Sequence, residues 1–289
     1  MTPLAWRALG RTIDTPDGRV FVVELGKDKP GIPVLLLHGF PTSSWDFCEV
    51  AVALAEERPV VAFDFLGFGF SDKPARFAYS LFEQADVTER VLRELGVSRV
   101  HVVAHDMGTS VTTELLARRE RGLLSFRPAS VTLSNGSVYI EMASLTFGQR
   151  LLRSPLGPLF ARLNSRRTFV AQLRRILARP VDEAILEGMW EQVSREDGAR
   201  RLPAIIGYIA ERHRFAARWN TALARLDIPV LVAWGARDPV AILAIGQRLA
   251  REIPGARRVI WEDLGHYPQI EDPPRFIRTV SEFLRALSG

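Results

Sequence analysis

The chain has 289 residues, of which 47% are hydrophobic and 25% are charged. This composition excludes a disordered chain, and the length suits one α/β domain that carries an insertion. The formal net charge is +5. No zinc spacing, RNA-binding motif or basic run with interleaved aromatic residues accompanies that charge, so we expect no nucleic-acid partner.

The sequence also limits where the protein is expected to act. It has no stretch of about 18 uninterrupted apolar residues, so no membrane span is predicted. Its first residues lack the basic head and apolar stretch of a secretion signal. Cys48 is the single cysteine, which excludes an intramolecular disulfide and suits a reducing compartment. These features predict a cytoplasmic protein and leave its oligomeric state open.

Short apolar runs alternate with longer helical patterns, which is typical of a mostly parallel sheet with helices on both faces. Several runs end at glycine-containing turns, such as His38-Gly39 and Asn135-Gly136. In chain order, the predicted elements are strands at 19–25, 34–37 and 60–65, a helix at 82–95, a strand at 100–104, a helix at 110–119, strands at 130–133, 230–234 and 258–261, and a helix at 274–287.

The alternation of strands and helices stops between residues 137 and 220. This stretch has helical spacing interrupted by prolines and no strand of its own. We therefore predict a core formed by residues 1–136 and 221–289, with residues 137–220 inserted as a helical cap. The alternative is ordinary helical packing that has no role in a site.

The segment around Asp106 carries the most specific signal in the sequence. Residues 102–109 read Val-Val-Ala-His-Asp-Met-Gly-Thr, and they pass from a predicted strand into a predicted helix. Small residues two before and two after a nucleophile allow the sharp turn called the nucleophile elbow, and Ala104 and Gly108 meet this need. The other interpretation of Asp106 is a carboxylate that caps a helix.

An aspartate at the elbow favours particular chemistry. Its ordinary pKa is about 3.9, so Asp106 is anionic at neutral pH and needs no base to attack a saturated carbon. The predicted turn at His38-Gly39-Phe40-Pro41 also follows a strand. Such a turn can aim backbone N–H groups at a developing oxyanion, and the N–H groups of Phe40 and Met107 are the expected pair.

An acid and a base follow later in the chain. Asp238 comes just after a late predicted strand, and His266 comes after the last one. The order nucleophile, acid, histidine is that of the α/β hydrolases. The other four histidines occupy the predicted oxyanion turn, a strand, the elbow and the cap, so His266 is the predicted base. Asp238 is the predicted acid, and Glu141 is the alternative.

At these residues the sequence resembles the aspartate-nucleophile branch of the α/β hydrolases, which includes epoxide hydrolases and haloalkane dehalogenases. It is more closely similar to the mesoderm-specific transcript proteins. The resemblance extends from about residue 31 to residue 273 and implies an α/β-hydrolase fold with an inserted helical cap. The matching stretches are residues 38–44, 64–74, 82–85, 105–106, 133–136, 238–240, 266–269 and 271–273.

The resemblance also implies a mechanism in two steps. Asp106 opens the electrophile and becomes esterified. His266, oriented by Asp238, then activates a water molecule that attacks the ester, while the N–H groups of Phe40 and Met107 hold the oxyanion. No metal or organic cofactor is required in this mechanism.

The leaving group separates an epoxide from a halide. A leaving halide needs N–H donors around it, and dehalogenases of this branch place such side chains at the positions of Met107 and Phe40. Neither side chain is a donor here, although Trp45 could supply one. Tyr208 lies in a segment similar to the late-cap tyrosine motif of epoxide hydrolases, and Tyr139 is a second candidate for protonating the leaving oxygen. The alternative role for both tyrosines is packing between the cap and the core. The predicted substrate-binding residues are Phe40, Trp45, Tyr139 and Tyr208.

We therefore expect a hydrolase that opens a small apolar epoxide to a vicinal diol through an aspartyl ester. A haloalkane dehalogenase or another α/β hydrolase is the alternative. A protein of another class, a non-enzymatic binding module built on this fold, is the third hypothesis.

Overall fold

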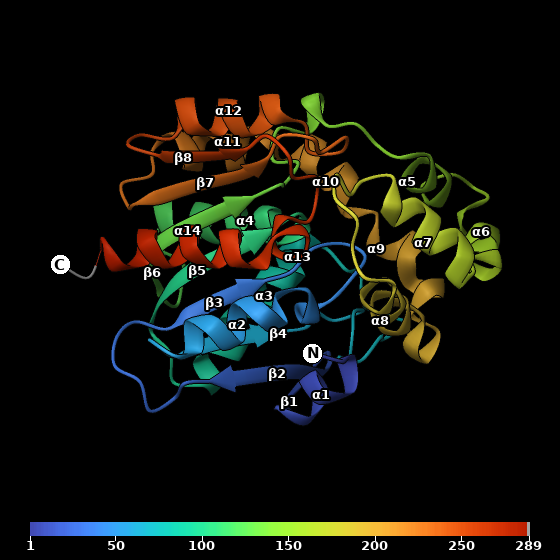
Figure 1. The fold of residues 1–289 in the computed structure, drawn as a ribbon, viewed down its shortest axis with the longest axis horizontal. Coiled ribbons are helices and arrows are strands. Elements are labelled where there is room, and N and C mark those ends of the chain that lie inside the picture. Colours follow the sequence, from blue (N-terminus) through green and yellow to red (C-terminus); the bar gives the residue numbers. More distant parts are fainter. Residues whose placement is uncertain (288–289) are drawn as a thin grey trace.

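An eight-stranded sheet forms the centre of the molecule in a computed structural model that describes residues 1–287 (Figure 1). Its strand order is β1-β2-β4-β3-β5-β6-β7-β8. β2 pairs antiparallel with β1 and with β4, and the other neighbours pair parallel. The strands are β1 (Gly10–Thr15), β2 (Gly18–Leu25), β3 (Val34–Leu37), β4 (Val60–Phe63), β5 (Arg99–His105), β6 (Arg127–Ser134), β7 (Val230–Gly235) and β8 (Arg257–Trp261).

The apolar runs of the sequence are the strands at the centre of this sheet. Every residue of β3, β4 and β7 is buried, as expected for parallel strands that helices cover on both faces. Each predicted strand is found, with ends that differ by at most a few residues. β1 was not predicted, because Ile13 is its only buried residue and its remaining pattern is polar.

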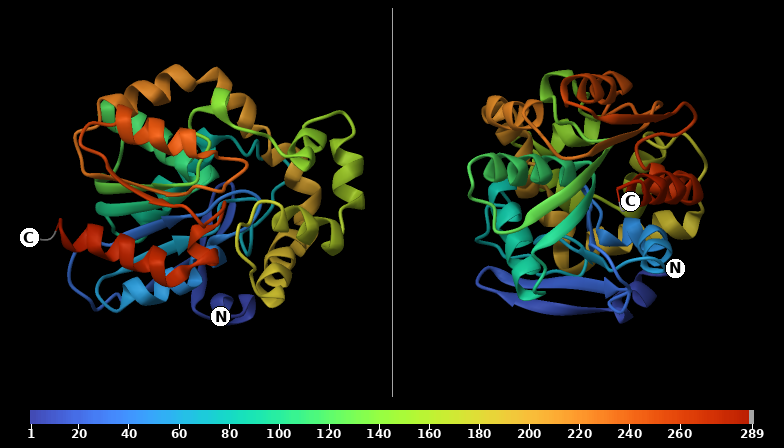
Figure 2. Two further views of the ribbon diagram at one scale, coloured as in Figure 1. Left: turned by 45° about the horizontal axis from the view of Figure 1, so that its top comes forward. Right: turned by 90° about the vertical axis from the view of Figure 1, so that its left-hand side faces the viewer.

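Helices cover both faces of the sheet, as predicted. α3 (Leu81–Glu94), α4 (Met107–Glu120) and α11 (Ala216–Ala224) lie on one face, and α2 (Cys48–Ala55) and α14 (Pro273–Arg285) lie on the other (Figure 2). α12 (Leu243–Glu252) packs on β7. The start of α3 is fixed by a capping box between Ser80 and Glu83. The predicted helices at 82–95, 110–119 and 274–287 correspond to α3, α4 and α14.

The chain between β6 and β7 is helical and contains no strand. Figures 1 and 2 show α5 to α9 grouped beyond the carboxyl ends of the parallel strands. α11 packs on α4 and runs past residue 220, where the predicted cap ends. The elements of this segment are η2 (Ile140–Met142), α5 (Phe147–Leu152), α6 (Gly157–Leu163), α7 (Arg166–Arg174), α8 (Glu183–Ser194), η3 (Arg195–Arg201), α9 (Leu202–Ile205), α10 (Tyr208–Arg214) and α11.

Three short helices complete the described chain: α1 (Pro3–Ala8), η1 (Ser44–Phe47) and α13 (Pro268–Glu271). Within residues 1–287, no helix has both the length and the apolar character needed to cross a bilayer.

Candidate active site

Asp106 occupies a sharp turn between β5 and α4. Its backbone has φ 46° and ψ −112°, a conformation that residues with side chains rarely adopt. The turn packs tightly against the loop after β3. A Cβ on Gly108 would lie 2.4 Å from the carbonyl oxygen of Leu37, and one on Gly39 would lie 2.5 Å from the Cβ of Asp106. Glycine is therefore required on both sides of this contact.

One backbone N–H group donates to the Asp106 carboxylate, and a second lies at the start of the helix that follows it. The N–H of Phe40 donates to its Oδ1 over 2.8 Å. Met107 is the first residue of α4, so its N–H has no carbonyl partner within the helix and lies at the positive end of the helix dipole. The side chain of Asp106 is buried, with 2% of the residue exposed.

His266 and Asp238 converge on this carboxylate from the loops after β8 and β7. Nδ1 of His266 lies 2.7 Å from Oδ2 of Asp238, and its Nε2 lies 3.8 Å from Oδ2 of Asp106. All three residues are buried. The structure thus brings together the three side chains that the sequence predicted as nucleophile, acid and base.

Asp238 is held by hydrogen bonds to both of its oxygens. The N–H groups of Val240 and Ala241 donate to Oδ1 over 2.7 and 3.0 Å. The side-chain amide of Asn135 donates to Oδ2 over 2.8 Å, and its Oδ1 accepts the N–H of Gly235. Asn135 therefore orients the carboxylate that contacts the histidine.

Asn135 was not among the predicted site residues. Its Asn-Gly pair was interpreted as a turn after a strand and as part of a stretch that carries the family resemblance, with no role in the site. The alternative acid, Glu141, lies elsewhere: its carboxylate is exposed and pairs with Arg248 over 2.6 Å.

The charges at the site determine the protonation of His266. Burial alone would lower its pKa, but the charges of Asp238 and Asp106 and the hydrogen bond to Asp238 outweigh burial and raise the pKa to about 9. Burial would raise the pKa of Asp238, yet the interactions with His266 and Asn135 lower it. At neutral pH the imidazole is therefore protonated.

Two further histidines are buried near the site in structural positions. Nε2 of His38 accepts the N–H of Phe65 over 3.0 Å. Nε2 of His105 lies 2.7 Å from the carbonyl oxygen of His266, and burial lowers the pKa of His105 to about 4. Across residues 1–287, no group of three or more His, Cys, Asp or Glu side chains is arranged to hold a metal ion.

Tyr208 is the first residue of α10 and is buried against Phe40. The residue is 1% exposed, and its ring lies 5.9 Å from the ring of Phe40. Burial, and then the charge of Asp106, raise its pKa above the ordinary value. Its hydroxyl is buried without a hydrogen-bond partner among the described residues. A buried hydroxyl without a partner is uncommon and calls for an explanation.

The structure does not bring Tyr139 or Trp45 to the carboxylate in a comparable way. The hydroxyl of Tyr139 donates to Glu252 of α12 over 2.8 Å. The indole N–H of Trp45 donates to the carbonyl of Met1 over 3.1 Å. Both polar groups are therefore occupied by structural partners, in α12 and at the N-terminus.

A small cavity of about 70 Å³ lies beside His266, between the sheet and α5 to α9. Its walls are mainly apolar, with three amide side chains among them. The lining residues are Phe40, Pro41, Thr146, Gly148, Gln149, Leu152, Phe160, Asn164, Phe169, Gln172, Leu173, Ile176, Leu202, Val240 and His266.

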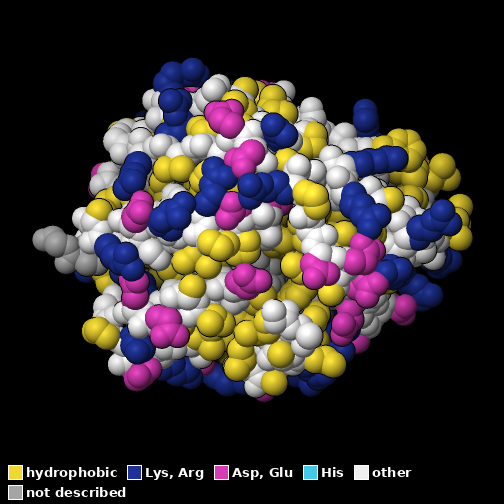
Figure 3. Space-filling model, viewed as in Figure 1, with side chains coloured by type: hydrophobic (Ala, Val, Ile, Leu, Met, Phe, Trp, Pro, Cys, Tyr) yellow, Lys and Arg dark blue, Asp and Glu magenta, His cyan; other side chains and the backbone are white. Residues whose placement is uncertain are grey.

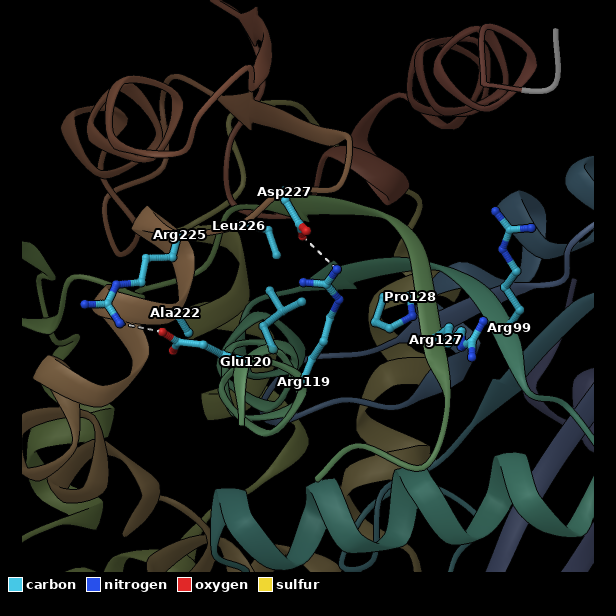
Figure 4. Close-up of a pocket in the computed structure, with 10 residues that line it drawn as sticks. Arg99, Arg119, Glu120, Arg127, Pro128, Ala222, Arg225, Leu226 and Asp227 are labelled. Carbon is cyan, nitrogen blue, oxygen red and sulfur yellow. Dashed lines mark hydrogen bonds and ion pairs between the residues drawn. The ribbon is translucent and has the colours of Figure 1, made fainter. Parts of the chain in front are cut away.

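A larger hollow, of about 780 Å³, lies near the amino ends of β5 and β6. Arg119 pairs there with Asp227 over 2.7 Å, and Arg225 pairs with Glu120 over 2.8 Å (Figure 4). No serine, cysteine or histidine lines it. Of the two, the smaller cavity is the one lined by a predicted catalytic residue, His266.

A family model described as alpha/beta hydrolase fold matches residues 32–273. The chain therefore belongs to this family and is an α/β hydrolase, and the predicted fold class is confirmed. Solved structures agree: an alpha/beta hydrolase fold protein from Burkholderia ambifaria has a TM-score of 0.78 and 26% identity, over 95% of this chain and 97% of that chain.

Two relatives are more similar in sequence. LipZ of Mycobacterium tuberculosis (strain ATCC 25618 / H37Rv), which is named as a hydrolase, is 44% identical over 96% of both chains. The mesoderm-specific transcript homolog protein of Bos taurus is 35% identical over 98% of this chain and 88% of the relative. The predicted resemblance to the mesoderm-specific transcript proteins is thereby confirmed.

Proposed function

We propose that this α/β hydrolase converts epoxides to vicinal diols through an ester formed on Asp106. One observation carries the proposal: the residue at the elbow is an aspartate, with an N–H donor at 2.8 Å on one oxygen and the imidazole of His266 at 3.8 Å from the other. A carboxylate in this position suits attack on a saturated carbon, whereas a serine suits attack on a carbonyl.

In the first step, Oδ2 of Asp106 attacks one ring carbon of the epoxide. A C–O bond to Asp106 forms, the ring C–O bond breaks, and the leaving oxygen takes the proton of the Tyr208 hydroxyl. The raised pKa of Tyr208 keeps that hydroxyl neutral before the reaction. The unpartnered state of the hydroxyl supports this role, since the epoxide oxygen would supply its missing acceptor.

In the second step, a water molecule loses a proton to His266 and adds to the ester carbon. The negative charge that develops on Oδ1 faces the N–H of Phe40 and the start of α4 at Met107. The intermediate collapses by breaking the bond to the alkyl oxygen, which takes the proton from His266 and leaves as diol. The Asp106 carboxyl group then returns a proton to the Tyr208 phenolate.

In this mechanism the charge of Asp106 determines when His266 can act as a base. While Asp106 is anionic it helps to raise the pKa of His266 to about 9, so the imidazole is protonated and cannot act as a base. Esterification removes that charge. The pKa of His266 then falls, the imidazolium releases its proton to solvent, and the neutral imidazole can accept a proton from water. When the Asp106 carboxylate is restored, His266 takes up a proton from solvent again.

Residues 137–220 form the cap in this proposal. The segment carries Tyr208 and most of the residues that line the cavity. Because the cavity is lined mainly by this segment, the packing of its helices sets the shape of substrate that can reach His266. Apolar walls favour an apolar substrate.

A parallel assay separates this proposal from its alternatives. Purified protein is incubated with styrene oxide, 1-bromobutane and 4-nitrophenyl acetate, and diol, bromide and nitrophenol are measured. We expect diol formation that Asp106→Asn abolishes. Bromide release as the dominant reaction would make the protein a dehalogenase, nitrophenol release would make it an esterase, and no turnover of any substrate would favour a binding protein.

A further inference from the structure

The outer part of the helical segment has an unusual charge composition. Between Glu141 and Asp182 the sequence contains eight arginines and no acidic residue. Arg166, Arg174 and Arg179 pair with acidic residues outside this stretch. The other five are exposed and form no ion pair within residues 1–287; these are Arg150, Arg153, Arg162, Arg167 and Arg175.

Large apolar side chains are exposed on the same part of the molecule. Leu156, Leu159 and Leu163 follow the i, i+3, i+7 spacing that puts them on one face of α6. They are 60%, 55% and 71% exposed, and Phe147 at the start of α5 is 69% exposed. Figure 3 shows hydrophobic and basic side chains next to one another at the right-hand end of the molecule, where Figure 1 has α6.

A groove lies between this surface and the cavity beside His266. The groove, of about 440 Å³, is lined by Phe147 and Arg175, among others. It shares the side chains of Phe160, Gln172 and Ile176 with the cavity beside His266. The groove and the cavity are therefore neighbours that share part of their lining.

We propose that α5, α6 and the first turn of α7, here called the cap patch, dock on a bilayer that contains anionic phospholipids. The leucines of α6 would insert at the boundary between headgroups and acyl chains, and the unpaired arginines would contact phosphate groups. The groove would then face the membrane, from which an apolar substrate could pass directly into the protein.

The charge of the cap patch favours a lipid surface over a second copy of this chain. Two copies that met through this patch would bring two sets of unpaired arginines together, with no carboxylate in either stretch to compensate them. An anionic headgroup layer is complementary to the same arginines. Docking of this kind needs no spanning helix.

The test is co-sedimentation with vesicles of phosphatidylcholine, with and without phosphatidylglycerol. We expect wild-type protein to bind only the vesicles that contain phosphatidylglycerol, and less at high salt. Leu159→Ser with Leu163→Ser, and separately Arg162→Glu with Arg167→Glu, should lower the partition coefficient at least about tenfold.

Matched controls come from the opposite end of the molecule. Leu123 is 67% exposed at the end of α4, and Arg93 is exposed on α3. Leu123→Ser and Arg93→Glu should bind vesicles like wild type. Equal losses in control and cap variants, no binding of wild type to anionic vesicles, or self-association that Leu159→Ser abolishes would each overturn the proposal.

The measurement does not depend on the chemistry at Asp106. Asp106→Asn should bind anionic vesicles as wild type does, even though it should not turn over an epoxide. Failure of the epoxide assay with intact vesicle binding would therefore affect only the proposed function. All the cap variants leave the cavity lining unchanged, so circular dichroism and the turnover of a water-soluble epoxide report whether they fold.

Discussion

An aspartate at the elbow, where a serine is usual, changes the role of His266. A serine must lose a proton before it attacks, whereas Asp106 is already an anion. The protonated state of His266, with its pKa raised to about 9, is therefore compatible with the first step of the proposed reaction and would have to change only for the second. The two half-reactions should respond to different substitutions.

Removing the imidazole should stop the reaction at the ester. With His266→Gln, Asp106 keeps its N–H donor from Phe40, so alkylation should continue while hydrolysis of the ester stops. Mass spectrometry of the intact protein should show a gain equal to the mass of the epoxide. Wild-type protein treated in the same way should show no lasting gain. An inactive variant that never gains mass would assign His266 to the first step.

Tyr208→Phe should slow the alkylation step. The loss of one general acid typically costs about 10²–10⁴-fold in rate. Because the Tyr208 hydroxyl has no partner in the structure, its removal leaves no group unsatisfied, and the melting temperature should be unchanged or raised. Pre-steady-state measurement of ester formation gives the rate.

Tyr139→Phe is the matched control. Its hydroxyl bonds to Glu252, so this variant should lose some stability but alkylate at nearly the wild-type rate. A large drop in alkylation for Tyr139→Phe, with less than about threefold for Tyr208→Phe, would reverse the two roles. Residual activity in either variant is measured against Asp106→Asn.

At the scale of elements, the site depends on how closely α4 approaches the loop after β3. Gly108→Ala would add a Cβ at 2.4 Å from the carbonyl oxygen of Leu37, and backbone atoms cannot move away as a flexible side chain can. We expect a loss of about 1–3 kcal/mol in the free energy of unfolding, as for overpacked positions, together with a loss of activity. Thermal unfolding that matches wild type would show that the elbow tolerates a wider spacing.

The strands and the triad could be predicted because local sequence determines them. A run of four apolar residues predicts β3, and all four are buried in the structure. The strand order then brings the loops after β5, β7 and β8 to one edge of the sheet. No comparable pattern in the sequence predicts the direction of a side chain outside the regular strands and long helices. Tyr139 and Trp45 were therefore assigned to substrate binding, although the structure directs their polar atoms to Glu252 and Met1.

At the scale of the whole molecule, the sequence predicted that residues 137–220 are helical but not how those helices pack. The spacing of apolar residues in this stretch does not indicate which element α6 packs against. Leu156, Leu159 and Leu163 at α6 remain exposed in the structure. Asn135 was missed for a related reason. Its contacts with Asp238, Gly235 and Gly265 join segments about a hundred or more residues away, and a single Asn-Gly pair does not indicate them.

The stability of the whole molecule should depend on pH through His266. Because its folded-state pKa is raised to about 9, the group stabilises the fold fully below its ordinary pKa of about 6.5 and loses this effect as the pH rises through about 9. The melting temperature of wild type should therefore fall more steeply over this range than that of His266→Gln. Equal slopes for the two proteins would contradict the raised pKa.

A single turnover in ¹⁸O-labelled water tests the ester on Asp106 most directly. With enzyme in excess over epoxide, water attacks the ester carbon, so the label should enter the Asp106 carboxylate and the first diol should contain only unlabelled oxygen. Peptide mass analysis would locate the label on Asp106. If the first diol instead carries the solvent oxygen and Asp106 stays unlabelled, water attacks the epoxide directly and no ester forms.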